Sequence, residues 1–201
     1  MACAFHSLFR LSPKLVELYQ PNLFSEILPA LHDQASYSIS LYIRTGHTER
    51  VHIETEQETT LKVYRNKTQQ IVDCALGLEE QAGKDDSSKK KNIVWMVVTD
   101  SPYIKEWIHE KYGGANHSHR TIITTRARGA HTKFKRNVPS TADFAEAFLD
   151  WWLIGESNDA VVSDSTAPSF GNTAVFRTIK PYYKFLKGGG GKCQLTPSSL
   201  A

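Results

Sequence analysis

Three polar clusters in the sequence each follow an apolar run and contain residue types that hold phosphate groups. They are Arg44-Thr45-Gly46, Thr99-Asp100-Ser101 and Ser163-Asp164-Ser165-Thr166. A guanidinium offers a planar fork of donors with a permanent charge, and a nearby glycine lets the backbone approach a ligand closely. The clusters therefore indicate a phosphate site centred on Arg44. An arginine that only pairs with a surface carboxylate is the alternative.

Two acidic residues have a binding and a structural interpretation. Asp100 could accept a hydrogen bond from a ribose hydroxyl, or it could cap a helix that begins at Pro102. Asp150 lies in a predicted helix beside Trp151 and Trp152, where a buried carboxylate needs a partner. An internal cation would make Asp150 a support for the site.

The loop "SDSTAPSFGN" precedes a predicted helix and is rich in small hydroxyl residues. Hydroxyls and backbone amides at a helix N-terminus could hold a second phosphate edge or a base. A simple solvent-exposed loop is the alternative. The sequence contains no DxD motif and no cluster of carboxylates, so we expect no metal and predict that side-chain cations stabilise a diphosphate.

These clusters must be positioned by alternating strands and helices. Buried or β-branched runs predict strands at 38–43, 93–100, 120–126 and 159–165. Helical spacing predicts helices at 56–81, 102–112, 140–157 and 172–180, and two short helices in 12–34 because Pro21 and Pro29 interrupt the pattern.

The alternation predicts a Rossmann-like α/β domain with a mostly parallel sheet and helices on both faces. Ligands of such sheets bind beyond the carboxyl ends of the strands, where all three polar clusters would meet. We expect one domain over residues 1–186 and a disordered glycine-rich tail over 187–201.

Composition excludes several classes of protein. The 201 residues are 40% hydrophobic and carry a net charge of only +3, with basic residues spread along the chain, so a nucleic-acid partner is not expected. Cys3, Cys74 and Cys193 have no zinc-site spacing and indicate no disulfide framework. We expect no membrane segment in this chain, because no apolar run approaches the roughly 20 residues of a membrane span.

Four segments, in order, resemble successive motifs of GDP-fucose-dependent fucosyltransferases with the two-domain GT-B fold. They are "SISLYIRTGHTE", "VWMVVTDSPYIKEW", "TIITTRARGAHT" and "DFAEAFLDWWLIGESNDAVVSDSTAPSFGNTA", and the resemblance spans about residues 3–180. It implies a C-terminal donor-binding domain that holds GDP-fucose without a cofactor.

The resemblance also implies roles for individual residues. Arg44 matches the arginine that contacts the β-phosphate and stabilises the leaving group, which makes it the candidate catalytic residue. Asp100 matches an acid near the nucleoside, and Asp150 matches the acid of a "D-x-x-x-L" helix. Ser169 and Phe170 match a pair near the diphosphate and guanine. The candidate donor-binding residues are Arg44, Gly46, Asp100, Ser101, Asp150, Ser163, Ser165, Thr166, Ser169 and Phe170.

Four positions depart from the pattern of the family. Tyr42 stands where the family usually has His, Ser101 replaces a second Asp, Pro168 occupies the first position of Ser-Thr-Phe, and His47 replaces an Asp. A catalytically inactive nucleotide-binding or structural module is therefore the alternative function. An unrelated doubly wound phosphate-binding domain is a third interpretation, disfavoured because the sequence lacks a G-x-S-x-G elbow and a Walker loop.

The resembled enzymes place the acceptor site and the usual base in a separate N-terminal domain. We therefore expect the chain to be a fragment of an inverting fucosyltransferase that is inactive in isolation. A full-length protein would use a glycan or protein acceptor, and an upstream anchor or signal would place it in the Golgi or ER lumen.

Overall fold

The computed structural model describes residues 10–45, 53–84, 92–114, 117–126, 140–164, 169–185 and 193–196. Its centre is a six-stranded sheet in the order β3-β2-β1-β4-β5-β6. The strands are β1 (Ser36–Ile43), β2 (Asn92–Thr99), β3 (Arg120–Thr124), β4 (Ala160–Asp164), β5 (Tyr182–Phe185) and β6 (Cys193–Thr196). β1 to β5 are parallel and β6 is antiparallel, so the predicted mostly parallel α/β fold is confirmed.

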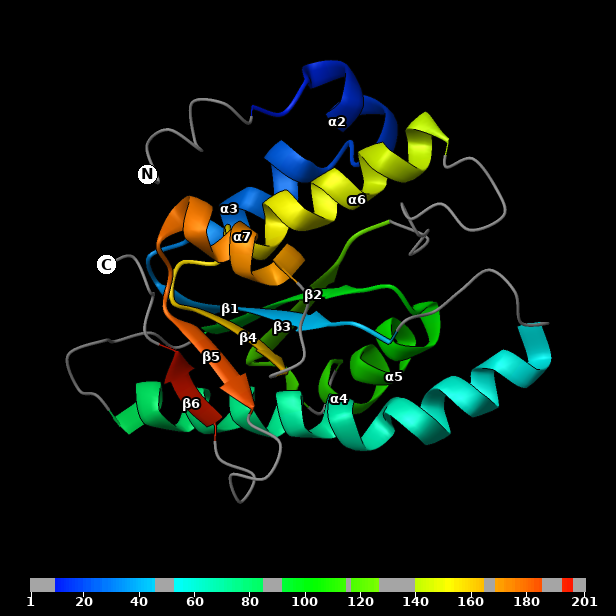
Figure 1. The fold of residues 1–201 in the computed structure, drawn as a ribbon. Helices are drawn as coiled ribbons and strands as arrows, with labels where there is room; N and C mark the ends of the chain where they lie inside the picture. Colours follow the sequence, from blue (N-terminus) through cyan, green and yellow to red (C-terminus); the bar gives the residue numbers. More distant parts are fainter. Residues whose placement is uncertain are drawn as a thin grey trace.

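Helices cover both faces of this sheet (Figure 1). The helical elements are α2 (Pro13–Tyr19), η1 (Leu23–Ile27), α3 (Leu28–His32), α4 (Ile53–Lys84), α5 (Pro102–Tyr112), α6 (Thr141–Ile154) and α7 (Ser169–Thr178). α4 and α5 lie on one face, and the other helical elements lie on the opposite face. In the part of the chain that the structure describes, no helix has the length and apolarity that crossing a bilayer requires.

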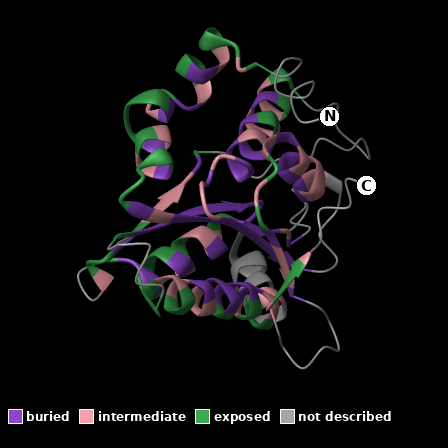
Figure 2. Ribbon diagram, turned by 90° about the vertical axis from the view of Figure 1, so that its left-hand side faces the viewer, coloured by how far each residue is buried: buried purple, intermediate pink, exposed green. Residues whose placement is uncertain are grey.

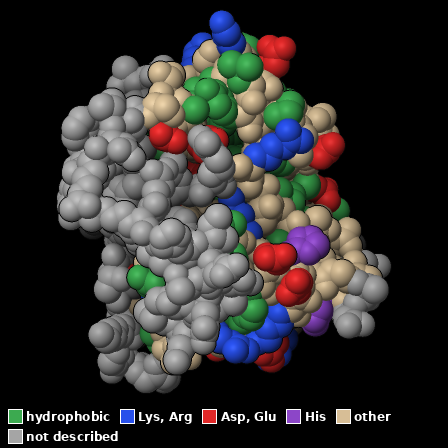
Figure 3. Space-filling model, turned by 90° about the vertical axis from the view of Figure 1, so that its right-hand side faces the viewer, with side chains coloured by type: hydrophobic (Ala, Val, Ile, Leu, Met, Phe, Trp, Pro, Cys, Tyr) green, Lys and Arg blue, Asp and Glu red, His purple; other side chains and the backbone are tan. Residues whose placement is uncertain are grey.

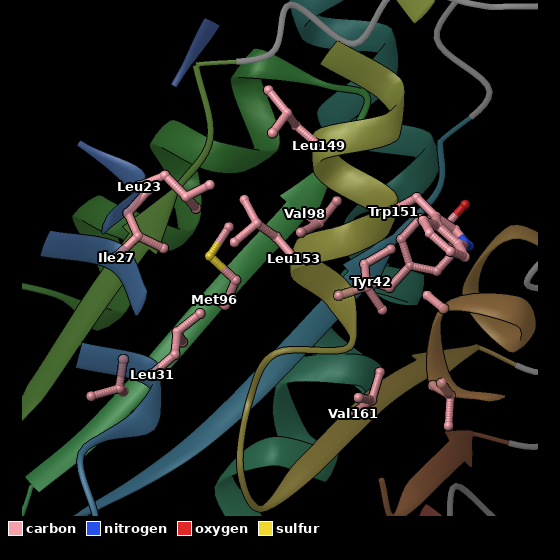
Figure 4. Packing of buried hydrophobic residues seen from close by; sticks show 14 of the residues in the cluster. Leu23, Ile27, Leu31, Tyr42, Met96, Val98, Leu149, Trp151, Leu153 and Val161 are labelled. Carbon is pink, nitrogen blue, oxygen red and sulfur yellow. The ribbon is translucent and has the colours of Figure 1, made fainter. Parts of the chain in front are cut away.

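Each face of the sheet has its own hydrophobic cluster, because side chains alternate along a strand. In β2, Met96 and Val98 contact the cluster under α6, while Trp95 and Val97 contact the cluster under α4 and α5. Figure 4 shows the first cluster, in which Leu153 lies against Met96 and Val98. The central strands β1, β2 and β4 are buried on both faces, as Figure 2 shows for the centre of the molecule. This explains why they appear in the sequence as nearly unbroken apolar runs.

Local residue chemistry sets several helix boundaries. The sequence offered Ser140 or Thr141 as the cap of α6, and the structure shows that Ser140 is the cap, in a capping box with Asp143. α5 spans the predicted residues, and Gly113 is its C-cap. Pro21 separates the first two helical segments as predicted. Pro29, by contrast, lies in the first turn of α3 without interrupting the second segment, because the first turn does not need the missing N–H.

The C-terminal part of the fold corrects the sequence prediction. α7 begins at Ser169 rather than at 172, and β5 was missed. Residues 193–196 fall within the segment predicted to be disordered, but they form β6 and pair with β5. Both strands have only four residues, so neither gives a clear alternating pattern in the sequence.

A disulfide bond joins Cys74 of α4 to Cys193 of β6, with the two Cα atoms 5.2 Å apart. The cysteine spacing in the sequence indicated no disulfide framework, and this bond corrects that interpretation. The two residues are 119 positions apart in the sequence, and only the pairing of β6 with β5 carries Cys193 to α4. Cysteine spacing alone could not reveal this contact.

Candidate functional site

The strand order defines one place where a ligand would bind. It is the 3-2-1-4-5-6 order of doubly wound sheets, whose topological switch point lies between the first and fourth strands. The register places Ile43 beside Thr99 of β2, and Tyr42 beside Ser163 of β4. The carboxyl ends of β1, β2 and β4 therefore lie together. We call this region the switch-point site.

Arg44 follows β1 at this site and pairs with a buried acid. Its Nη1 lies 3.1 Å from Oδ2 of Asp100, whose side chain is only 2% exposed, whereas that of Arg44 is 28% exposed. The other carboxylate oxygen of Asp100 accepts hydrogen bonds from the Thr45 amide, at 2.7 Å, and the Thr45 hydroxyl, at 2.8 Å. Asp100 therefore fixes both the guanidinium and the backbone after β1. Because Asp100 is buried, this contact is not the surface ion pair that the sequence left open.

Lys67 of α4 enters the same site, and sequence reasoning missed it. Its Nζ lies 2.5 Å from Oδ2 of Asp164 and donates to the carbonyl oxygen of Arg44 at 3.1 Å. It therefore joins the ends of β1 and β4. The sequence did contain a signal for this position. Lys67 lies four residues before Ile71 and therefore falls on the helix face that packs against the sheet.

Asp150 of α6 lies beside an internal cation. Burial raises the pKa of Asp150 to about 6, opposed by a hydrogen bond from Thr125 and by the charge of Lys105. Lys105 donates to the carbonyl oxygen of Thr125 at 3.0 Å, and burial lowers its pKa against the opposing charges of Asp150 and Glu146. Asp150 thus has the internal partner that would make it a support for the site.

One oxygen of Asp150, Oδ1, has no hydrogen-bond partner among the described residues. Leaving a buried carboxylate oxygen without a hydrogen-bond partner is energetically costly. Its role as a donor-binding residue stays a prediction.

Two predicted hydroxyl residues are occupied within the protein. Ser101 is fully buried and caps α5, where its Oγ accepts from the amide of Ile104 at 3.4 Å. Ser163 is also fully buried, and its Oγ lies 2.6 Å from the hydroxyl of Tyr182. The structure therefore gives both residues internal roles beside the site.

The remaining candidates lie on α7 or outside the described residues. Phe170 is partly buried and its ring centroid lies 5.8 Å from that of Tyr42. Ser169 is the first residue of α7. Gly46, Ser165 and Thr166 lie outside the described residues.

Figure 3 shows the face of the molecule at which β1 ends, with basic and acidic side chains interspersed. A separate cavity of about 280 Å³ lies between α6 and the start of α2. Its lining residues are Arg10, Leu11, Ser12, Leu15, Phe148, Trp151 and Trp152. None of them belongs to the switch-point site.

Comparison with known proteins agrees with this fold. No protein-family model matches the sequence, and no curated protein matches it. Among solved structures, the chain is similar to an arginine-to-lysine mutant of the fucosyltransferase FUT1 from Arabidopsis thaliana in complex with GDP, with a TM-score of 0.50 and 13% identity. The match covers 95% of this chain and 37% of that chain. The likeness shows a fold that matches one half of a GT-B-like glycosyltransferase.

Proposed function

We propose that this chain is the donor-binding half of a fucosyltransferase-like protein and that it binds GDP-fucose at the switch-point site. The observation that carries the proposal is Arg44, a partly exposed guanidinium held by the buried carboxylate of Asp100 at the end of β1. A cation fixed at a topological switch point is suited to a diphosphate. The similarity to a GDP-bound FUT1 structure supports the choice of nucleotide.

Arg44 would act on the leaving group. As the bond between the anomeric carbon and the β-phosphate oxygen breaks, that oxygen keeps the electron pair and GDP gains negative charge. The guanidinium stabilises this charge, while an acceptor hydroxyl attacks the anomeric carbon from the opposite face and inverts it. Asp100 would act by positioning Arg44. The acceptor and the base that takes its proton would come from residues beyond this domain.

A second candidate, a catalytically inactive nucleotide-binding module, is supported by Tyr42. The family that the sequence resembles usually has His at this position, but Tyr42 is 5% exposed and packs against Phe170. Burial raises the pKa of Tyr42 far above its usual range, so the phenol stays protonated. Tyr42 would then contribute to packing rather than to proton transfer.

Titration calorimetry with GDP, GDP-fucose and UDP tests the proposal. We expect GDP and GDP-fucose to bind better than UDP, because the resemblance matches the site to a guanine nucleotide. The same titration in EDTA should give nearly unchanged affinity, because we propose that side-chain cations, and not a metal ion, balance the charge of the diphosphate. Equal or absent binding of both nucleotides would contradict the nucleotide assignment, and a strict requirement for Mg²⁺ or Mn²⁺ would contradict the role of Arg44.

A further inference from the structure

A second cation lies at the switch point on the side of α4. Lys67 Nζ contacts Asp164 at the end of β4 and the carbonyl oxygen of Arg44 after β1. These are the two strands between which the ligand of a doubly wound sheet sits. We propose that Lys67 is a second phosphate-binding residue, which contacts the diphosphate together with Arg44. This inference rests on the proposed function and assigns one more residue of the same site.

The two ion pairs share an arrangement that favours an incoming anion. The side chains of Arg44 and Lys67 are 28% and 30% exposed, whereas those of Asp100 and Asp164 are 2% and 7% exposed. In each pair the carboxylate is closed to solvent and its cation is reachable. An anion that enters the site therefore meets the two cations before it meets either acid.

The donors of the ammonium group leave room for a ligand. Lys67 carries three N–H donors; it donates to the Arg44 carbonyl, while its contact with Asp164 is an ion pair. A phosphate oxygen would accept from a remaining donor. A diphosphate has two charged groups, so a second cation would complement the single guanidinium of Arg44.

A purely internal role for Lys67 is the competing explanation. A buried carboxylate such as Asp164 is costly without a counter-ion, so Lys67 could serve only to neutralise it. The two roles predict different behaviour when both charges are removed. If Lys67 contacts phosphate, then removing Asp164 as well cannot restore the lost affinity. If Lys67 only neutralises Asp164, the double variant should bind normally.

The test compares GDP with guanosine, which lacks phosphate, by titration calorimetry on the 201-residue chain. We expect Lys67→Met to weaken GDP binding by about 10-fold or more, the size expected for a charge-assisted hydrogen bond, and to leave guanosine binding within about 2-fold. Lys84→Met is the matched control, because Lys84 also lies on α4 and pairs with an acid, Glu80, but both side chains are highly exposed. This control should bind GDP as the unmodified chain does.

The double variant Lys67→Met/Asp164→Asn decides between the two roles and also covers the case in which Lys67→Met fails to fold. Persistent loss of GDP affinity in a folded double variant supports phosphate contact. Normal GDP affinity in the double variant, or in a folded Lys67→Met, overturns the proposal for Lys67 while the proposed function stands. Absence of GDP binding by the unmodified chain would overturn the proposed function, and this inference with it.

Discussion

At the scale of single residues, the geometry of the cation at the switch point matters as much as its charge. Arg44 forms an ion pair with Asp100 through one of its nitrogens, Nη1. A planar guanidinium can hold one carboxylate and still present a second edge to a phosphate. An ammonium group would have to divide its donors without this fixed geometry.

Replacing Arg44 tests this argument. We expect Arg44→Lys to weaken GDP binding by about 1–3 kcal/mol although the charge is kept, because the bidentate fork is lost. Arg44→Ala should weaken binding at least as much. Calorimetry gives the affinity, and thermal unfolding of each variant shows whether the domain stays folded. Unchanged affinity in Arg44→Lys would reduce Arg44 to a structural ion pair with Asp100.

Asp150 gives the protein a pH dependence of stability that can be measured. Its pKa rises from the ordinary value of 3.8 to about 6 on folding, chiefly through burial. A folded state that binds a proton more tightly than the unfolded chain is stabilised at low pH. This stability is fully present below about pH 4 and is lost as the pH rises through about 6.

Asp150→Asn should remove this dependence. We expect the free energy of unfolding of Asp150→Asn, relative to the unmodified chain, to increase by on the order of 1–3 kcal/mol between pH 4 and pH 7. Urea unfolding at several pH values measures it. Asp73→Asn is the control, because Asp73 is exposed on α4 and accepts from Gln69. A difference that stays flat with pH would show that Asp150 ionises normally in the fold.

At the scale of elements, the position of α7 depends on close packing against β1. A Cβ atom added at Gly171 would lie 2.7 Å from Cδ1 of Tyr42, and the Tyr42 side chain is buried. The helix can therefore approach the strand only because this residue lacks a side chain. This contact sets the distance from α7, with Phe170, to the switch-point site.

We expect Gly171→Ala to destabilise the fold by about 1–3 kcal/mol, because the Tyr42 ring or α7 must move. Gly77→Ala on α4 is the opposite control. Nothing lies within 4 Å of the added Cβ there, so alanine should stabilise the helix by about 0.5–1 kcal/mol. Chemical denaturation of both variants measures the two effects. A neutral Gly171→Ala would show that the packing of α7 on β1 is loose.

The disulfide fastens the edge of the sheet to a helix. Cys74 and Cys193 connect α4 to β6, which is the edge strand of the described sheet and pairs with β5. Constraining so long a loop stabilises the folded state mainly by restricting the unfolded chain. We expect Cys74→Ser/Cys193→Ser to lower the free energy of unfolding by about 2–4 kcal/mol. A reducing agent should destabilise the unmodified chain but not this variant. Equal stability with and without reductant would mean that the bond does not form in solution.

The elements that sequence could predict are those whose signals are local. α5 begins at Pro102 and ends before Gly113, and Ser140 caps α6. Each of these boundaries is marked by a residue at the helix end itself. The buried strands β1 and β2 also have a local signal, because each is an apolar run in the sequence. β5, β6 and the bond to Cys193 depend on residues far away in the chain, and no local pattern marks them.

The candidate site divides in the same way. Arg44 and Asp100 follow the ends of parallel strands, so their proximity could be predicted from the sequence. Lys67 and Lys105 come from helices, and their positions depend on the helix phase and on how each helix crosses the sheet. Ser101 and Ser163 have the right residue type and place, but the structure uses their hydroxyls internally.

At the scale of the whole molecule, the described sheet with its two helical layers has one topological switch point at which a ligand would bind. The described residues form a single sheet, and Arg44 and Lys67 lie at its switch point. The chain spans 37% of the length of the FUT1 chain that it resembles in fold. These observations fit a module that binds a donor. Under the proposed function, the acceptor would be held by residues outside the described sheet.

Glycosyl transfer needs more than a bound donor. An acceptor hydroxyl must lie in line with the anomeric carbon, near a base that takes its proton, and this positioning supplies a large share of a rate enhancement. We therefore expect the 201-residue chain to bind GDP-fucose but to transfer no fucose. The assay incubates it with labelled GDP-fucose and a panel of galactosides, chitooligosaccharides and folded protein domains, with Arg44→Ala as the background control. Robust transfer that depends on Arg44 would show that the chain is sufficient for catalysis, and that the acceptor and base lie within these residues.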